Sequence, residues 1–276
     1  MQLGISTLGH LVELGLKNSF KALADLQLES FTECLDFAEE KGINIVELVI
    51  EPPELFKNEY QQKFIELLES YSLNYQVHAP FIDVNLCSHN NRISEASIES
   101  CIDTIILCHK IGAKILTIHP GLANFMLESI RAFNKEQLKR AIYKLLDFTK
   151  KQNLIICLEN MPQQAKIMTD NKNIEEVLGF INHKDLFLTY DTSHFYMCEG
   201  NVEQLWSKFH SIIKNIHIVD NLSKESDTHP PLGNGKIDFK EIFHIINKFN
   251  YEGPLIIELS SAKSLNQSIN FISKFL

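Results

Sequence analysis

The chain has 276 residues, of which 45% are hydrophobic, enough for a large core, and its 35 acidic and 26 basic side chains give a formal net charge of −9. This balance excludes a broad basic surface of the kind that binds nucleic acid non-specifically, although metal ions held in a cleft would reverse the sign of the charge locally. We expect no membrane span, because no run of about 18 apolar residues occurs, and no signal peptide, because the first residues lack a basic segment followed by a long apolar one.

The six cysteines form no C-x-x-C pair, and several of them fall within apolar helix or strand patterns. They are Cys34, Cys87, Cys101, Cys108, Cys157 and Cys198. This usage is typical of reduced core thiols, so we expect a cytoplasmic protein.

Short apolar runs typical of strands alternate with helical patterns along the chain. The runs lie near residues 2–6, 44–49, 75–79, 114–118, 154–158, 186–190, 215–219 and 255–259. Apolar residues with helical spacing fill most of the gaps, over 28–41, 93–111, 135–151, 173–182, 202–213, 239–249 and 265–275. Eight strands separated by helices predict an α/β fold, a (β/α)₈ TIM barrel that forms a single domain over residues 1–276. A doubly wound sheet is the alternative, but the turn after the first run, Ser6 to His10, lacks its Gly-rich phosphate motif.

Imidazole and carboxylate side chains stand at the downstream ends of these runs and in one later loop. The nine are His78, His119, Glu159, Asp191, His194, His217, Asp227, His229 and Glu258. Burying such groups is costly unless they are paired or bind a metal, and in a parallel barrel the strand ends converge on the face that carries the active site. We therefore expect a multi-metal site. Its ligand types suit divalent ions, with Zn²⁺ favoured and Mn²⁺ or Mg²⁺ as alternatives, and the lack of thiolate argues against a structural zinc site.

Each of these motifs also has a simpler explanation. Asp191 and His194 could be a helix N-cap and a residue of the first turn, and Glu159 or Glu258 could form structural ion pairs. Asp227 and His229 lie in a loop rich in Pro and Gly that could be flexible and polar. The joint occurrence of such residues in seven segments favours the metal site. The other six histidines lack this placement, and we expect them to be surface or core residues; they are His10, His89, His109, His183, His210 and His244.

The motifs resemble those of the xylose-isomerase-like TIM-barrel superfamily, and most closely its endonuclease IV branch (AP endonuclease family 2). In chain order they are H-A-P-F from His78, H-P-G from His119, E-N from Glu159, D-T-S-H from Asp191, H-I-V-D from His217, D-T-H from Asp227 and I-E ending at Glu258. The resemblance spans most of the chain, from about Gln2 to Glu258.

The resemblance implies up to three zinc ions and hydrolysis of a phosphoester, in abasic-site DNA or a related sugar phosphate. One ion would be held by His78, His119 and Glu159; a second would share Glu159 and add Asp191, His217 and Glu258; the third would be held by His194, Asp227 and His229. Glu159 and Glu258 are the expected catalytic residues, and Phe81 and Asn160 the expected substrate-binding residues. The chain departs from this branch in the loop over residues 50–57, which is acidic and lacks a segment with Arg and aromatic residues for opening a duplex.

The isomerase and epimerase branch of the same superfamily is the alternative. There the resemblance implies one divalent metal on Glu159, Asp191, His217 and Glu258, with Glu159 and Glu258 also transferring protons on a sugar or sugar phosphate. That branch usually has a substrate-binding Arg near residues 227–229, whereas this chain has no Arg after Arg140. A third hypothesis is a degenerate barrel that binds a metal or ligand without catalysis.

Overall fold

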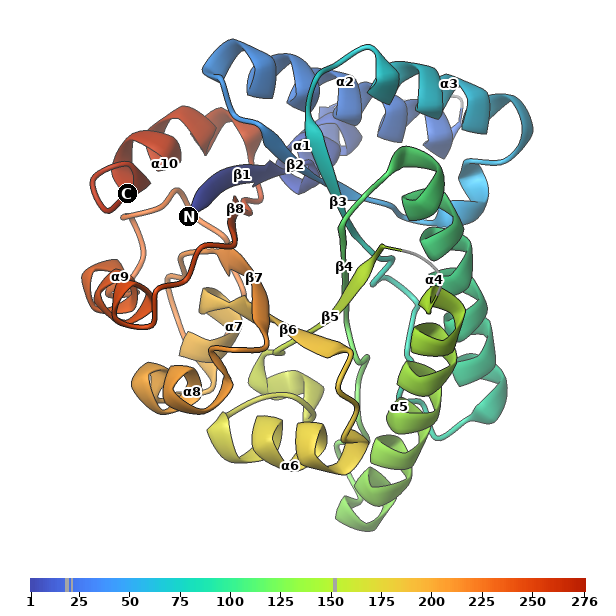
Figure 1. Cartoon of the computed structure of the whole chain (residues 1–276), viewed down its shortest axis with the longest axis vertical. Helices are drawn as coiled ribbons and strands as arrows, with labels where there is room; N and C mark the ends of the chain where they lie inside the picture. Colours follow the sequence, from blue (N-terminus) through green and yellow to red (C-terminus); the bar gives the residue numbers. More distant parts are fainter. Residues whose placement is uncertain (18–19, 21, 151–152) are drawn as a thin grey trace.

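A closed barrel of eight parallel strands forms the centre of the protein, and each strand pairs with its neighbours in chain order (Figure 1). The computed structural model describes residues 1–17, 20, 22–150 and 153–276. The strands are β1 Gln2–Ser6, β2 Ile45–Val49, β3 Asn74–His78, β4 Ile115–Ile118, β5 Ile155–Glu159, β6 Leu186–Asp191, β7 Ile213–Ile218 and β8 Pro254–Ile257. The predicted (β/α)₈ TIM barrel is thus confirmed, with strand positions close to those expected.

Helices surround the barrel (Figure 1). They are α1 Leu8–Lys17, α2 Leu23–Lys41, α3 Asn58–Glu69, α4 Asn91–Ile111, α5 Glu128–Thr149, α6 Asn171–Ile181, α7 Thr192–Met197, α8 Val202–Phe209, α9 Phe239–Lys248 and α10 Leu265–Ile272, with 3-10 turns η1 Pro53–Leu55, η2 Gln163–Ala165 and η3 Ala262–Ser264. The sequence patterns did not predict α1 or α3, and they gave α7 only as the alternative in which Asp191 caps a helix. Helix α3 is mostly polar and buries only Phe64 and Leu68, so its periodic signal is weak. The expected end of the fifth helix at Lys151 lies outside the described residues.

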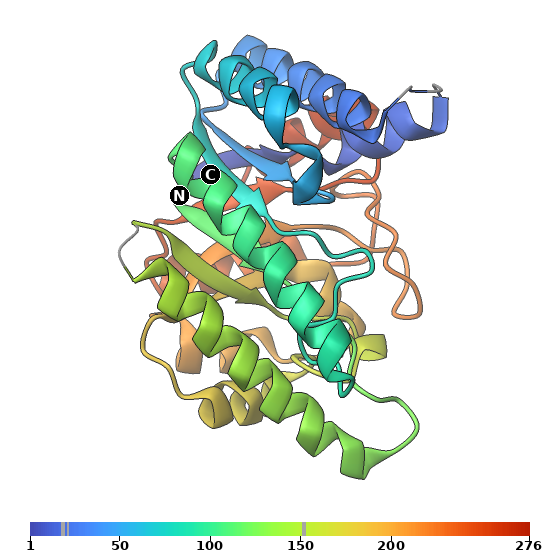
Figure 2. The same cartoon turned by 90° about the vertical axis from the view of Figure 1, so that its right-hand side faces the viewer.

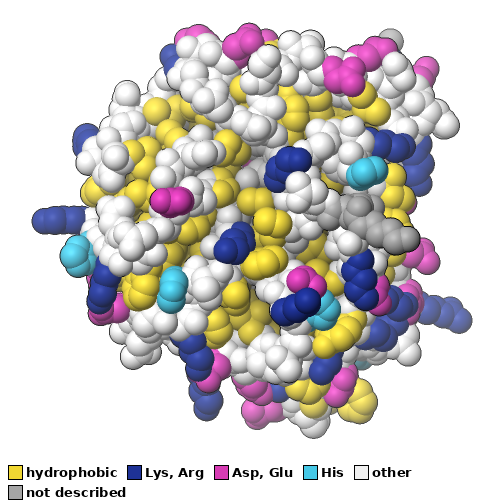
Figure 3. All heavy atoms as spheres, in the orientation of Figure 1, with side chains coloured by type: hydrophobic (Ala, Val, Ile, Leu, Met, Phe, Trp, Pro, Cys, Tyr) yellow, Lys and Arg dark blue, Asp and Glu magenta, His cyan; other side chains and the backbone are white. Residues whose placement is uncertain are grey.

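All six cysteines are free thiols, and five of them are buried. Within the described residues, no helix combines the length and the apolar character needed to cross a bilayer. Figure 3 shows one face of the molecule, in the orientation of Figure 1, where Lys and Arg side chains lie interspersed with Asp and Glu. This face therefore presents mixed charge and not one continuous basic area.

A layer of hydrogen-bonded polar side chains lies in the middle of the barrel. Glu47 of β2 accepts a hydrogen bond from the Gln76 amide of β3 (2.8 Å) and one from the Asn215 amide of β7 (3.2 Å). Asn215 also donates to the Thr117 hydroxyl (3.2 Å), which lies 2.9 Å from the Thr189 hydroxyl. Buried polar groups are tolerated when they are hydrogen-bonded, so this network makes it possible for a carboxylate to lie inside the barrel.

The loop after β7 is fastened by one buried carboxylate. Asp220 accepts hydrogen bonds from the backbone N–H groups of Gly233 (2.9 Å), Gly235 (2.7 Å) and Ile237 (3.3 Å). A Cβ on Gly235 would collide with this carboxylate, which explains the glycine there. Figure 2 shows the loop, in orange, projecting on the side of the barrel toward which α1, in dark blue, also extends. Asp220 therefore sets the position of the segment that carries Asp227.

Replacing Asp220 with Ala should lower the free energy of unfolding by about 2–4 kcal/mol, because three backbone donors would lose a charged acceptor. Chemical denaturation would measure the change, and Asp185→Ala, a substitution at an exposed position, is the control. Equal stability of the two variants would contradict the role of Asp220.

Candidate metal centre

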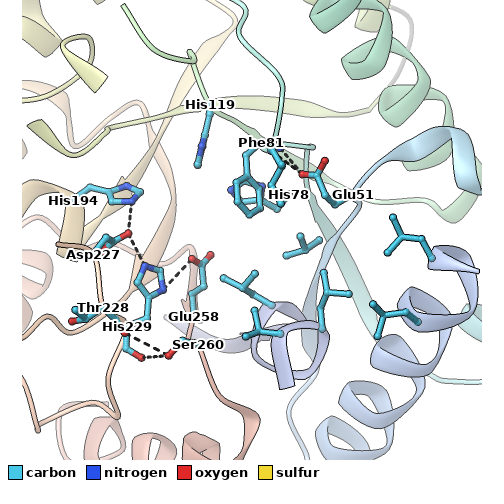
Figure 4. Close-up of a pocket in the computed structure, with 17 residues that line it drawn as sticks. Glu51, His78, Phe81, His119, His194, Asp227, Thr228, His229, Glu258 and Ser260 are labelled. Atoms are coloured by element: carbon cyan, nitrogen blue, oxygen red, sulfur yellow. Dashed lines mark hydrogen bonds and ion pairs between the residues drawn. The ribbon is translucent and has the colours of Figure 1, made fainter. Parts of the chain in front are cut away.

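The structure brings all nine predicted ligand residues together at the carboxyl-terminal ends of the strands. His78, Glu159 and Asp191 are the last residues of β3, β5 and β6. Asp191 pairs in register with His217 of β7, which places these two residues side by side. The other five come from just after β4 and β8, from α7 and from the loop after β7; they are His119, Glu258, His194, Asp227 and His229. Figure 4 shows most of this set around one opening.

Glu159 lies at the centre of the cluster and is buried among four imidazoles. Its Oε2 atom is 3.4 Å from Nε2 of His78 and 3.1 Å from Nε2 of His119. Its Oε1 atom is 3.2 Å from Nδ1 of His194 and 3.4 Å from Nδ1 of His217. Each carboxylate oxygen thus faces a different pair of imidazoles.

Asp227 and Glu258 occupy the outer part of the cluster. The Oδ2 atom of Asp227 lies 3.1 Å from Nε2 of His194 and 2.8 Å from Nε2 of His229. Glu258 places Oε1 3.4 Å from Nδ1 of His229 and Oε2 3.5 Å from Nδ1 of His217. Like Glu159, Glu258 therefore has its two oxygens directed at different imidazoles.

Asp191 caps a helix with one carboxylate oxygen and leaves the other oxygen unpartnered. Its Oδ1 atom accepts a hydrogen bond from the backbone N–H of His194 (2.7 Å) and so caps α7, with His194 in the first turn. Its Oδ2 atom is buried and has no hydrogen-bond partner. One oxygen of this carboxylate orients the helix, and the other remains free to bind a ligand.

The unpaired atoms in this cluster suit a divalent cation. Nδ1 of His217, Nδ1 of His229 and Oδ2 of Asp191 are buried without a hydrogen-bond partner among the described residues, a state that costs about 1–3 kcal/mol per group. The nearest carboxylate oxygens to the two imidazole nitrogens lie 3.4 Å away without hydrogen-bond alignment. Two ligand atoms about 2.1 Å from one tetrahedral ion would be roughly 3.4 Å apart. The donor atoms are therefore spaced as ligands of shared ions.

Several overlapping ligand sets are available. Four groups of three residues place one ligand atom each within 4.8 Å of one another. Three of them, His78 with Glu159 and His217, Glu159 with Asp191 and His194, and His194 with Asp227 and His229, consist of predicted residues. The fourth adds Glu47 to His217 and Glu258.

The side chains perturb each other's protonation strongly. Burial alone would lower the pKa of His78, His194 and His217, but contacts with Glu159 and other carboxylates raise the pKa of His78 to about 9 and those of His194 and His217 well above their usual value. Burial alone would raise the pKa of Glu159, but the neighbouring imidazoles outweigh this effect and hold the pKa well below its ordinary range. Burial, together with the charges of Glu159 and Asp227, raises the pKa of Asp191 to about 7. The metal-free cluster therefore holds protons that a metal would displace.

Glu47 belongs to the cluster, although the sequence patterns did not point to it. It is fully buried beneath the cluster, with its two oxygens 3.0 and 3.1 Å from Nε2 of His217. This contact directs the other ring nitrogen, Nδ1, toward Glu159 and Glu258. The available signal was a carboxylate in the middle of the otherwise apolar run 45–49.

The two predicted substrate-binding residues differ in their surroundings. Phe81 lines the cavity above the metal ligands, and its ring centroid lies 5.4 Å from that of His78. Asn160 is buried, and its amide exchanges two hydrogen bonds with the backbone of Asp191 (2.8 and 3.0 Å). Asn160 thus holds the end of β6 in place, and its contact with substrate remains a prediction. Glu51, from the acidic loop, accepts hydrogen bonds from the backbone N–H groups of Phe81 (2.7 Å) and Ile82 (3.1 Å).

The comparisons with known proteins agree with this architecture. The family model described as xylose isomerase-like TIM barrel matches residues 35–275. An uncharacterized protein of Methanocaldococcus jannaschii is 31% identical over 214 residues, which are 77% of this chain and 81% of that protein. A protein of Mycoplasma pneumoniae named probable endonuclease 4 is 27% identical over 215 residues, 71% of this chain and 73% of its own. The crystal structure of a D-tagatose 3-epimerase-like protein superposes on this chain with a TM-score of 0.81 at 23% sequence identity. The superposition covers 100% of this chain and 97% of the chain of that protein, which shows a shared fold.

Replacing Glu47 with Gln should weaken zinc binding by about 10–100-fold, the usual effect of removing a carboxylate that orients a ligating imidazole. Competition with a zinc chelator would measure the affinity, and ¹⁵N NMR of the imidazoles would report the tautomer of His217. Glu40→Gln, at an exposed position, is the control. An unchanged affinity and tautomer would show that Glu47 does not act through His217.

Zinc binding should release protons at pH 7, because the raised pKa values of His78, His194 and His217 keep these side chains protonated in the metal-free protein whereas zinc binds neutral imidazole. The apparent affinity should therefore rise between pH 6 and pH 8, by about tenfold per pH unit for each proton released. Calorimetry in two buffers of different ionisation enthalpy would count the protons. An affinity that is flat over this range would contradict the expectation.

Proposed function

The chain belongs to the xylose isomerase-like TIM barrel family, and we propose that it is a metal-dependent phosphoester hydrolase of the endonuclease 4 type, acting on abasic-site DNA or a related sugar phosphate. The observation that carries this proposal is the outer cluster of His194, Asp227 and His229, whose ligand atoms lie within 4.8 Å of one another. A one-metal isomerase has no need of this cluster. The relative named probable endonuclease 4 supports the same choice.

The proposed ligand sets follow the contacts of Glu159. Glu159 would link an ion on His78 and His119 to one on Asp191 and His217, because its two oxygens face these two sides. His194, Asp227 and His229 would hold a third ion. Bound divalent ions would supply a polarised phosphoryl oxygen and a water of lowered pKa.

The chain's own residues would then orient the reactants. Glu159 is held rigidly by four imidazoles, so it can accept a hydrogen bond from the attacking water in one fixed direction. Glu258 approaches the same ring nitrogen of His217 as Glu159 does and is a second acceptor near the mouth of the cavity. Phe81 would pack against the sugar of the substrate. Phosphate contacts would come mainly from the ions, since the described residues that line the cavity include no Lys or Arg.

The second candidate is a divalent-metal-dependent sugar or sugar-phosphate isomerase or epimerase. The observation that favours it is the pair Glu159 and Glu258, which flank His217 with oxygens 3.4 and 3.5 Å from its Nδ1 atom. Two carboxylates next to one metal site would suit proton transfer at a carbon adjacent to a carbonyl. The superposition on a D-tagatose 3-epimerase-like protein is consistent with this candidate.

The double variant Asp227→Asn/His229→Gln separates the two candidates. Under the hydrolase proposal, the wild type should bind close to three zinc ions per chain, and the variant should bind one fewer. The activity of the variant on an abasic-site oligonucleotide should fall by at least about 100-fold, because an ion that stabilises transition-state charge contributes several kcal/mol. Metal analysis of the purified protein and a nicking assay would test both expectations. Asp185→Asn is the matched surface control.

One bound metal in the wild type, together with conversion of D-tagatose or D-fructose that persists in the double variant, would reject the hydrolase in favour of the epimerase. Retention of full nicking by Glu159→Gln would remove Glu159 from its proposed role.

A further inference from the structure

The cavity above the metal ligands has two chemically different walls. Its volume is about 550 Å³. One side is formed by the predicted metal ligands that Figure 4 labels, which are His78, His119, His194, Asp227, His229 and Glu258. The seven unlabelled side chains of Figure 4 are all apolar and lie together away from His194 and Asp227. Those used below, here called the apolar wall, are Leu8, Leu11 and Val12 of α1, Leu26 of α2, and Ile82 after β3.

Helix α1 directs apolar side chains both into the protein core and toward the cavity. Leu14 is buried in the protein, whereas Leu8, Leu11 and Val12, at i, i+3 and i+4, are only half-buried and line the cavity. Apolar side chains gain free energy when they leave water. Concave pockets of this size with an apolar lining and a few polar groups are typical of small-molecule sites.

The apolar wall is held at a fixed distance from the metal ligands. Glu13 of α1 accepts hydrogen bonds from the Ser261 hydroxyl and from the backbone N–H of Lys263 (3.3 Å), both in the segment that follows Glu258. A Cβ on Gly9 would lie 2.9 Å from the backbone nitrogen of Ala262, so the helix rests directly on this segment. On the other side, Glu51 holds the backbone of Ile82 (3.1 Å). These contacts keep the cavity from closing on itself.

We propose that the substrate joins its metal-binding oxygen group to an apolar substituent, and that this substituent packs on the apolar wall. The inference rests on the proposed metal-dependent function of the same site. The substrate class is an ester whose alcohol part presents an aliphatic or aromatic surface to Leu8, Leu11 and Val12. A substrate with a chain of free hydroxyl groups fits this wall less well, because the apolar side chains offer the hydroxyls no hydrogen-bond partners.

Two hydroxamates test the inference on the zinc-loaded protein. Acetohydroxamate presents only the metal-binding group, and hexanohydroxamate adds four methylenes. Each fully buried methylene strengthens binding by roughly fourfold, so we expect hexanohydroxamate to bind at least about 20-fold more tightly. Leu11→Asn should reduce this ratio to about threefold or less and leave acetohydroxamate affinity unchanged. Calorimetry would measure binding, and the zinc content would be checked after each titration.

Leu16→Asn is the matched control, because Leu16 lies on the same helix, is 83% exposed and is not part of the wall. It should keep the full ratio. Val12→Thr, which preserves the shape and replaces one methyl group with a hydroxyl, provides a second variant with the same expected direction as Leu11→Asn. Equal affinities of the two hydroxamates for the wild type would overturn the apolar-substituent inference while the metal centre stands. Failure of both to bind the zinc-treated protein would overturn the metal centre and the inference with it.

Discussion

The burial of several carboxylates and imidazoles in one place is the constraint on which this site depends. Glu159 is buried and lies within 3.4 Å of four imidazoles, while Asp191 and Glu47 are buried as well. Charges of this kind are costly in a protein interior unless each has a partner. The imidazoles provide partners in the metal-free protein, but they leave three ligand atoms unsatisfied. Divalent cations would satisfy these atoms, so metal binding and the stability of this end of the barrel are linked.

The barrel makes this arrangement possible because it places eight strand ends around one axis. The ligands at the ends of β3, β5 and β6 are on rigid backbone, and the polar layer below them, centred on Glu47, is fully buried and hydrogen-bonded. The outer ligands, Asp227 and His229, come from a loop, and Asp220 compensates by binding three of that loop's backbone amides. Rigidity is thus provided by the sheet for the inner ligands and by one carboxylate for the outer ones.

The metal ligands and the apolar wall make different contributions to recognition. Metal ions held by the predicted ligands would bind oxygen-rich groups of several kinds, and the relatives and structural neighbours carry both endonuclease and epimerase names. The rest of the cavity is formed by α1, the start of α2 and the residues after β3, where the side chains are apolar. Under the proposed function, discrimination between substrates would therefore depend on segments outside the motifs that carry the predicted ligands. This is the usual division in barrels of this kind, where the loops after the strands vary around a fixed centre.

The sequence by itself predicted the barrel, and it predicted which side chains gather at one end of it, because both follow from local patterns. Apolar runs at regular spacing predict eight parallel strands, and side chains placed just after such runs must meet at one end of the barrel. It also predicted Asp191 as a helix cap or a ligand, without deciding between them. Only the tertiary structure showed that one oxygen of this carboxylate caps the helix while the other stays available as a ligand, since this depends on the direction of two oxygens. It also revealed the contact between Glu47 and His217, 170 residues apart, and the apolar wall on α1. Pairings over such distances leave no periodic trace in the sequence, because they arise from how the strands are arranged around the barrel.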